Sequence, residues 1–204
     1  EIFYYITLMN ENYAQPAMPD GVEVDILKGL YQFAGRSGQG PLTATLLGSG
    51  AILGEVMKAR DLLTEFEVDA EVWSVTSYKE LYKDALDTER YNRYHPDADP
   101  RPAYVTQCLG TAEGPIVAAS DYVKTLPLSI APFLSHGLVA LGTDGFGRSD
   151  GREALRDFFE VDARHIALSV LSELARRGDL DAAVVVKARD DWGIDPDREN
   201  PFSL

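Results

Sequence analysis

Residues 42–75 read LTATLLGSGAILGEVMKARDLLTEFEVDAEVWSV, and this stretch decides the fold class. It opens with an apolar run at 42–47, turns at 48–50, and continues with apolar residues at helical spacing from Ile52 to Phe66. A second run rich in β-formers follows at 70–75. Short apolar runs bounded by turn residues predict buried strands, and the stripe between them predicts a helix. A strand, a crossover helix and another strand indicate an α/β protein.

The same alternation extends to both sides of this stretch. Further strands are predicted at 2–9, 29–34, 116–119 and 138–141, with a short strand-like run at 103–109. Helices are predicted at 76–91, 121–126, 149–159, 162–177 and 181–192. We expect a capping box between Asp150 and Glu153, and a helix end at Gly178. The Pro-rich stretch 15–21 is the best candidate for a boundary, and the tail 195–204 is expected to be loosely held.

The composition is acidic, with 33 Asp and Glu against 19 Lys and Arg, and both halves of the chain share the excess. Such a field repels nucleic acid and anionic lipid, and no apolar run reaches the roughly 18 residues of a membrane span. It favours a basic protein partner, although a solvated acidic surface is the simpler explanation. The single Cys108 forms no internal disulfide, which fits a cytoplasmic location. Because the chain opens inside a β-like run without Met, we expect it to belong to a longer polypeptide.

Local motifs indicate no catalytic or metal centre. Gly48-Ser49-Gly50 stands between a strand and a helix, where backbone amides can hold an anion, but it lacks the remaining residues of a dinucleotide fingerprint or a P-loop. A tight turn is the ordinary interpretation. The three histidines lie far apart in the sequence, and Cys108 has no neighbouring ligand, so no zinc site is expected.

Residues 89–96 (ERYNRYHP) form a second stretch of interest. Arginine and tyrosine are favoured at interface hot spots, so this run is a candidate contact surface. The alternative is the exposed end of an amphipathic helix. The candidate interface residues in it are Arg90, Tyr91, Arg93 and His95.

Three longer strings are more specific. Residues 9–19 (MNENYAQPAMP), residues 89–96, and residues 141–150 (LGTDGFGRSD) with FEVD at 159–162 occur in this order. Together they resemble homodimeric bacterial pyruvate dehydrogenases, the thiamine-diphosphate-dependent first component of that complex. The second string departs from the family pattern, where Trp is expected at Tyr91.

The resemblance implies a fold and a parent activity. The fold would be the transketolase C-terminal one, a three-layer α/β/α sandwich with a mixed five-stranded sheet in which one strand is antiparallel. Residues 1–20 would end the preceding pyrimidine-binding domain, and residues 21–204 would form this domain. The parent would be a homodimer that uses thiamine diphosphate and magnesium to decarboxylate pyruvate and to acetylate the lipoyl group of the dihydrolipoyl acetyltransferase core.

The resemblance also implies what this stretch lacks. The family anchors the cofactor through a Gly-Asp-Gly motif and a following Asn pair, and this sequence has no such motif. We therefore expect the isolated chain to bind no thiamine diphosphate and to contain neither catalytic residues nor metal ligands. Supporting sites remain possible on two stretches. Asn10, Glu11, Asn12 and Tyr13 would lie near the substrate channel, and the loop that carries Asp144, Phe146, Arg148 and Asp150 would face the dimer partner or the active-site entrance.

Two other functions stay open at the level of sequence. The chain could come from another thiamine-dependent enzyme, a transketolase or a 2-oxoglutarate dehydrogenase first component. It could also be a free-standing regulatory module that binds a small ligand, with Gly48-Ser49-Gly50 as its only supporting feature.

Overall fold

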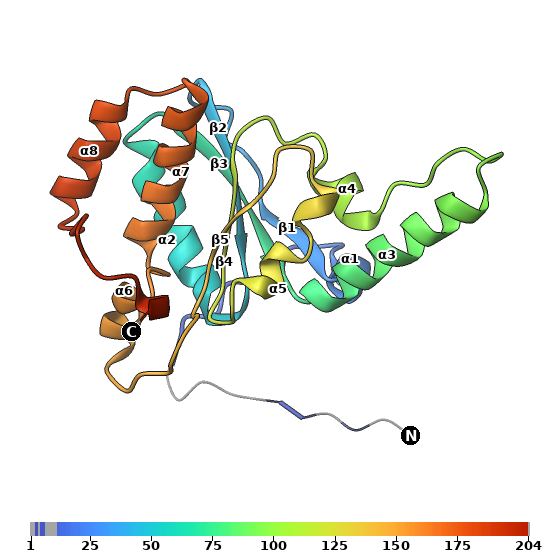
Figure 1. Ribbon diagram of the computed structural model, residues 1–204, viewed down its shortest axis with the longest axis horizontal. Helices are drawn as coiled ribbons and strands as arrows, with labels where there is room; N and C mark the ends of the chain where they lie inside the picture. Colours follow the sequence, from blue (N-terminus) through green and yellow to red (C-terminus); the bar gives the residue numbers. More distant parts are fainter. Residues whose placement is uncertain (1–2, 4, 7–11, 204) are drawn as a thin grey trace.

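A computed structural model describes residues 3, 5–6 and 12–203 of the chain. Figure 1 shows a central sheet with a layer of helices on each side. The elements in chain order are α1 Glu23–Lys28, β1 Leu30–Ala34, β2 Leu42–Gly48, η1 Gly50–Ile52, α2 Leu53–Thr64, β3 Val68–Val75, α3 Tyr78–Tyr94, α4 Tyr104–Leu109, β4 Ile116–Ala119, α5 Thr125–Leu128, η2 Ala131–Phe133, β5 Val139–Leu141, α6 Arg152–Phe158, α7 Ala163–Arg177, α8 Ala182–Asp191 and η3 Pro201–Ser203.

The sheet has five strands in the order β1-β3-β2-β4-β5. β2 pairs in parallel with both β3 and β4, and β4 pairs in parallel with β5. β1 is antiparallel to β3, in a register that sets Leu30 opposite Val75. The predicted mixed five-stranded sheet with one antiparallel strand is therefore confirmed, and all five strands fall where the sequence placed them.

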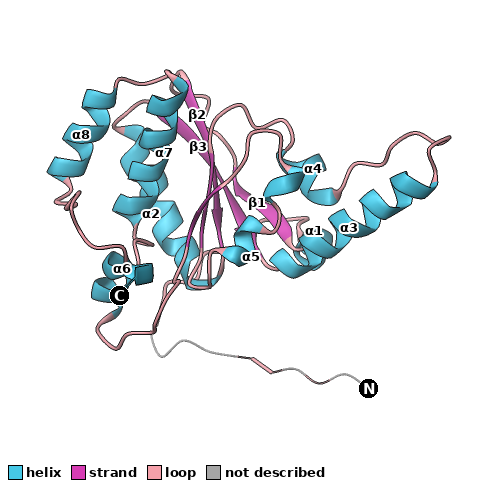
Figure 2. Ribbon diagram, viewed as in Figure 1, coloured by secondary structure: helices cyan, strands magenta, loops and turns pink. Residues whose placement is uncertain are grey.

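Each face of the sheet buries its own hydrophobic core. One core packs α2 and α7 against the sheet, around Val56, Ile166 and Leu171, with Trp192 at its margin. The other packs α3 and α4 against the opposite face, around Leu30, Leu47 and Leu81, with Trp73 at its margin. Figure 2 shows the strands between these two helical layers. The three-layer α/β/α sandwich is confirmed, because apolar residues on both sides of each central strand require cover on both faces.

The helix termini obey simple capping chemistry. The Ser77 side chain accepts a hydrogen bond from the Glu80 amide at the start of α3, and the Asp162 side chain accepts one from the His165 amide at the start of α7. Gly178 ends α7 in the left-handed conformation, with φ of 83°. The predicted helix end at Gly178 is confirmed.

The prediction of a capping box at the start of α6 is wrong. Gly151 is the N-cap residue and makes no side-chain cap bond. The Asp150 side chain accepts a hydrogen bond from the Gly151 amide at 2.6 Å, so it stands one residue too early to serve the first turn. The helix accordingly begins at Arg152.

Two other expectations for regular structure need correction. Residues 104–109 are helical, because Val105 and Leu109 lie on the same face of α4 and both are buried in the second core. The helix expected from 121 begins only at Thr125. The carbonyls of Asp121 and Tyr122 accept hydrogen bonds from the Thr143 side chain and amide, so the chain is tied to the exit of β5 before the helix starts.

The predictions for the two ends of the chain have different outcomes. The predicted strand at 2–9 falls largely outside the described residues; Phe3, Tyr5 and Ile6 lie in no strand and are exposed. The tail 195–204, which was expected to be loosely held, is instead docked on the domain. Pro201 is buried, and the Arg198 guanidinium lies 3.0 Å from an Asp157 carboxylate oxygen. Among the described residues, no helix is long and apolar enough to cross a bilayer.

Candidate functional site

The carboxyl ends of β2 and β4 meet at a pair of buried serines. The Ser49 hydroxyl donates to the Ser120 hydroxyl at 3.1 Å, and the Ser120 hydroxyl accepts from the Tyr122 amide at 3.0 Å. These contacts hold the two strand ends together. This edge is where parallel α/β sheets place their ligand-binding groups.

The turn that leaves β2 is as tight as the sequence predicts. A Cβ on Gly48 would lie 2.9 Å from the Leu53 Cα, so only glycine lets α2 pack this closely on the strand. Gly50 has φ of 56°, in the left-handed region. The tight-turn interpretation of Gly48-Ser49-Gly50 is confirmed.

A broad cavity of about 850 Å³ lies beside this turn and borders the chain entry at residues 13–16. The Tyr13 hydroxyl accepts hydrogen bonds from Arg152 at 3.1 Å and from Arg156 at 3.5 Å. Both arginines belong to α6, which thus anchors the entering chain to the domain. Asn12 is exposed, while Asn10 and Glu11 lie outside the described residues. The substrate-channel role of residues 10–13 stays a prediction.

Glu55 organises the wall of this cavity and was not singled out from the sequence. Its side chain is 8% exposed. The carboxylate pairs with Arg156 at 3.1 Å and with Lys58 at 2.9 Å, and it accepts a hydrogen bond from the Ala163 amide at 3.2 Å. One carboxylate therefore joins α2, α6 and the first turn of α7. The sequence does indicate that Glu55 is buried, because Glu55 follows Ile52 by three residues and so shares its buried helical face.

Asp162 is the most perturbed acid of the neighbouring cluster. Burial raises its pKa, but hydrogen bonds from His165 and Arg164 outweigh that effect and bring the pKa down to about 2. The Arg164 guanidinium lies 2.6 Å from both Asp162 and Asp157. Ligand atoms of Asp157, Asp162 and His165 lie within 4.8 Å of one another, but Arg164 already pairs with both carboxylates and Arg198 also pairs with Asp157. This arrangement is an ion-pair network that ties the start of α7 to α6.

The candidate interface run at the end of α3 forms a self-contained structure. His95 stacks on Tyr91 with ring centroids 4.0 Å apart, and the Arg101 guanidinium lies 3.3 Å from the Tyr91 centroid. Asn92 exchanges two hydrogen bonds of 2.9 Å with the Arg101 backbone. Figure 1 shows this end of α3 and the following loop extending away from the body of the domain. Tyr91 and Asn92 are half-buried, and the rest of the run is exposed. Its role as a contact surface stays a prediction for Arg90, Tyr91, Arg93 and His95.

The loop between β5 and α6 divides into fixed and exposed parts. The Asp144 carboxylate accepts from the Lys124 amide at 3.0 Å and lies 3.8 Å from the Lys124 ammonium, which ties it to the domain. Phe146 is 77% exposed, and the Arg148 guanidinium lies 5.6 Å from the Phe158 ring. Asp144 is thus already engaged, while Phe146 is the side chain of this loop that offers free apolar surface. That this loop faces the dimer partner or the active-site entrance stays a prediction.

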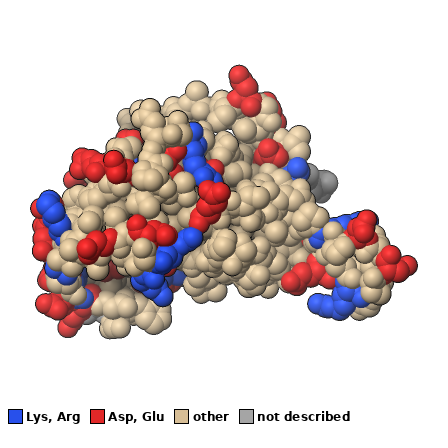
Figure 3. Space-filling model, turned by 90° about the horizontal axis from the view of Figure 1, so that it is seen from above, with Lys and Arg blue, Asp and Glu red and all other residues tan. Residues whose placement is uncertain are grey.

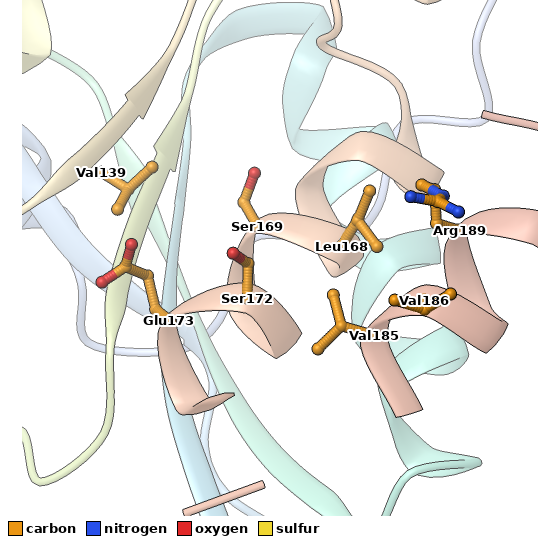
Figure 4. Close-up of a pocket in the computed structure, with 8 residues that line it drawn as sticks. All are labelled: Val139, Leu168, Ser169, Ser172, Glu173, Val185, Val186 and Arg189. Carbon is orange, nitrogen blue, oxygen red and sulfur yellow. The ribbon is translucent and has the colours of Figure 1, made fainter. Parts of the chain in front are cut away.

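A second hollow follows the outer strand β5. Figure 4 shows Val139 of β5 facing Ser169, Ser172 and Glu173 of α7, with residues of α8 closing the other side. This hollow of about 360 Å³ combines apolar and hydroxyl side chains. Its charged lining residues are Glu173 and Arg189, whereas seven charged residues line the cavity at the carboxyl edge, so the carboxyl edge is the better candidate site.

Comparison with known proteins gives a consistent result. Residues 29–162 match the family model described as the transketolase-like TK C-terminal domain. The chain is 49% identical to the pyruvate dehydrogenase E1 component of Pseudomonas aeruginosa over 204 residues, which are 99% of this chain and 23% of that protein. It is 44% identical to the protein of the same name from Cupriavidus necator, again over 23% of that protein. The chain thus spans about a quarter of the length of these curated relatives.

Solved structures show the same fold at much lower sequence identity. Transketolase from Leishmania mexicana matches 77% of this chain and 20% of its own, with a TM-score of 0.52 and 17% identity. A split-gene transketolase, described as an inactive β4 tetramer, matches 72% of this chain and 43% of its own, with a TM-score of 0.50 and 15% identity. The likeness to these structures concerns the fold alone. With its five-stranded mixed sheet and the match over residues 29–162, the chain belongs to the transketolase-like C-terminal domain family.

Proposed function

We propose that this chain is the C-terminal domain of a pyruvate dehydrogenase first component, in which it serves as a scaffold. The observation that carries the proposal is the 49% identity that extends over 99% of the chain. Transketolases share the fold at only 15–17% identity, which disfavours the transketolase alternative. The complete enzyme would decarboxylate pyruvate with thiamine diphosphate and magnesium and would work in the cytoplasm. Residues 1–20 would then lead in from the pyrimidine-binding domain.

The described residues do not fit the task of anchoring that cofactor. The sequence has no Gly-Asp-Gly motif. Among the described residues, the group with metal-ligand geometry is Asp157, Asp162 and His165, and Arg164 bonds both of its carboxylates. A cofactor diphosphate and its metal would have to be held elsewhere in the complete enzyme, so this domain is assigned no step of the reaction.

The scaffold role includes contacts with partners. The domain would contribute to the homodimer and would offer acidic surface to the acetyltransferase core. The net charge of −14 supports attraction of a basic partner. Figure 3 shows acidic and basic side chains interspersed around a broad uncharged area, so the acidic excess on this face is spread out and does not form one patch.

A chimera tests the proposal directly. The matching quarter of the Pseudomonas aeruginosa relative would be replaced by this chain, with the corresponding region of the Leishmania mexicana transketolase as a control graft. We expect the first chimera to retain pyruvate decarboxylation and the control graft to lose it, because this chain is 49% identical to the segment it replaces, whereas the transketolase region shares its fold at 17% identity to this chain. Association of the active chimera with the acetyltransferase core should weaken as salt is raised. A chimera that is folded and binds thiamine diphosphate yet fails to turn over pyruvate contradicts the proposal.

A further inference from the structure

The outer side of α3 carries a stripe of basic and apolar side chains, all of them exposed. At about 100° per residue, these side chains fall within about one third of the helix circumference. The buried residues Leu81 and Ala85 lie on a different side of the helix. We call the following set the basic stripe: Lys79, Tyr82, Lys83, Leu86, Arg90, Arg93 and Tyr94.

The basic stripe excludes acidic side chains, although acidic residues dominate the chain. The net charge of the whole chain is −14. α3 itself contains Glu80, Asp84, Asp87 and Glu89. By helical geometry, each of these carboxylates points at least about 80° away from the middle of the stripe. The positions of the charges along α3 thus create a local positive surface on an acidic protein.

Two basic side chains of the stripe are unpaired. Every Lys and Arg of the chain lies among the described residues, and of these only Lys79 and Arg93 make no ion pair, hydrogen bond or aromatic ring contact. Lys83 lies 3.7 Å from the exposed Glu80 carboxylate, a contact that water screens. The described part of the domain therefore leaves positive charge on the stripe without a partner.

The surroundings of the stripe leave room for a second chain. Figure 1 shows the end of α3 projecting from the body of the domain. At its base the Tyr82 ring lies 6.2 Å from the Phe133 ring of η2. The segment 125–143, which contains η2, has no Asp, Glu, Lys or Arg, and Figure 3 shows a broad uncharged area beside the projecting end. From Lys79 to Arg93 the stripe is about 21 Å long, which matches about four turns of a partner helix.

We infer that the basic stripe docks an acidic amphipathic helix of another protein. The carboxylates of that helix pair with Lys79 and Arg93, and its apolar side chains lie against Tyr82 and Leu86. The charges steer the encounter, and burial of the apolar ridge supplies affinity. A nucleic acid fits less well, because the rest of this acidic chain repels a polyanion. The inference goes beyond the proposed function, in which an acidic surface meets a basic partner.

The test is fluorescence anisotropy of the 204-residue chain with a labelled peptide of about 16 residues, built from Glu, Leu and Ala with the Leu residues on one helical face. Three comparison probes each change one property: Ser replaces Leu, Lys replaces Glu, or an oligothymidylate replaces the peptide. We expect the acidic leucine peptide to bind at least about tenfold more tightly than each comparison probe and to lose affinity as salt is raised. Equal binding of the serine peptide, tighter binding of the oligothymidylate, or no binding at about 1 mM peptide overturns the inference.

Variants locate the site. Lys79→Gln combined with Arg93→Gln should weaken peptide binding at least about tenfold, because it removes the two unpaired charges. Arg176→Gln combined with Lys187→Gln is the matched control, which removes the same charge from exposed pairs on α7 and α8 and should change the affinity by no more than about twofold. Circular dichroism verifies the fold of both chains. Undiminished affinity in the folded first variant contradicts the assignment, and the probe series on the wild-type chain decides the question if that variant does not fold.

Discussion

Asp162 shows how much a single carboxylate contributes to the joint between α6 and α7. It caps α7 through the His165 amide at 3.0 Å, and its other oxygen pairs with Arg164 at 2.6 Å. These contacts stabilise the ionised form of the carboxylate. A group whose pKa is lowered in the folded state adds stability above its unfolded pKa and loses it as the pH falls toward the folded value.

Asp162→Asn should therefore show a stability deficit that depends on pH. Asparagine keeps the cap but loses the charge, so we expect a loss of about 1–2 kcal/mol at neutral pH after allowance for solvent screening. The deficit should shrink between about pH 4, the unfolded pKa, and about pH 2, the folded pKa. Urea unfolding at a series of pH values measures it.

Asp190→Asn provides the control, because Asp190 forms an exposed pair with Arg189. Its effect should stay within about 0.5 kcal/mol at every pH. A stability deficit for Asp162→Asn that remains constant as the solution is acidified would show that the lost charge does not contribute to stability.

At the scale of elements, the contact between β2 and α2 depends on two glycines with opposite roles. Gly48 lies where any side chain would meet the Leu53 backbone at 2.9 Å, whereas a Cβ on Gly54 would meet no atom within 4 Å. Gly54 lies inside α2, where alanine is the better helix former.

Gly48→Ala should therefore destabilise the domain by about 1–3 kcal/mol, because the helix has to move away from the strand. Gly54→Ala should be neutral or stabilise it by up to about 1 kcal/mol. Thermal unfolding of the two variants beside the wild type makes the comparison. Equal effects from the two substitutions would mean that the close approach at Gly48 is easily relieved.

The strands were predictable because their apolar runs are short and end at turn residues. The run 42–47 ends at Gly48, and 116–119 begins after Gly114 and Pro115. Residues 104–109 have the composition of a strand, since YVTQCL contains β-branched and aromatic residues. Tertiary packing overrode that propensity by burying Val105 and Leu109 together. α1 gave no usable signal, because it buries no residue.

The site was less predictable than the fold. Gly48-Ser49-Gly50 was recognisable as a turn, because glycine pairs between a strand and a helix have a local meaning. The neighbouring cavity at residues 13–16 was not, because it needs Tyr13 from the chain entry, Glu55 from α2 and Arg156 from α6. Only the folded chain brings these residues together, and no spacing in the sequence encodes their proximity.

At the scale of the whole molecule, the C-terminal tail closes the structure over the β5–α6 loop. Gly145 has φ of 86°, and a Cβ there would lie 3.0 Å from the Pro201 carbonyl oxygen. Arg198 pairs with Asp157 at 3.0 Å and lies 5.8 Å from the Phe158 ring. The tail therefore adds to the stability of α6 without belonging to either core.

Removal of residues 195–204 should lower the free energy of unfolding by about 1–3 kcal/mol, within the range of an ordinary destabilising change. It should also speed proteolytic cleavage of the loop at 142–151, because that loop loses its cover. Arg198→Ala is the matched partial change and should give a smaller effect in the same direction. Unchanged cleavage after truncation would mean that the tail only rests on the surface.

The separation of the two cores has a spectroscopic consequence. The chain has two tryptophans, and Trp73 lies against one core while Trp192 lies against the other, with Phe66 edge-on at 5.7 Å. The Trp73 indole nitrogen is buried without a hydrogen-bond partner among the described residues, so the two indoles have different polar surroundings. Replacing either one with phenylalanine leaves a single native fluorophore on a chosen side of the sheet. Intrinsic emission can then report whether the two helical layers melt together or in succession.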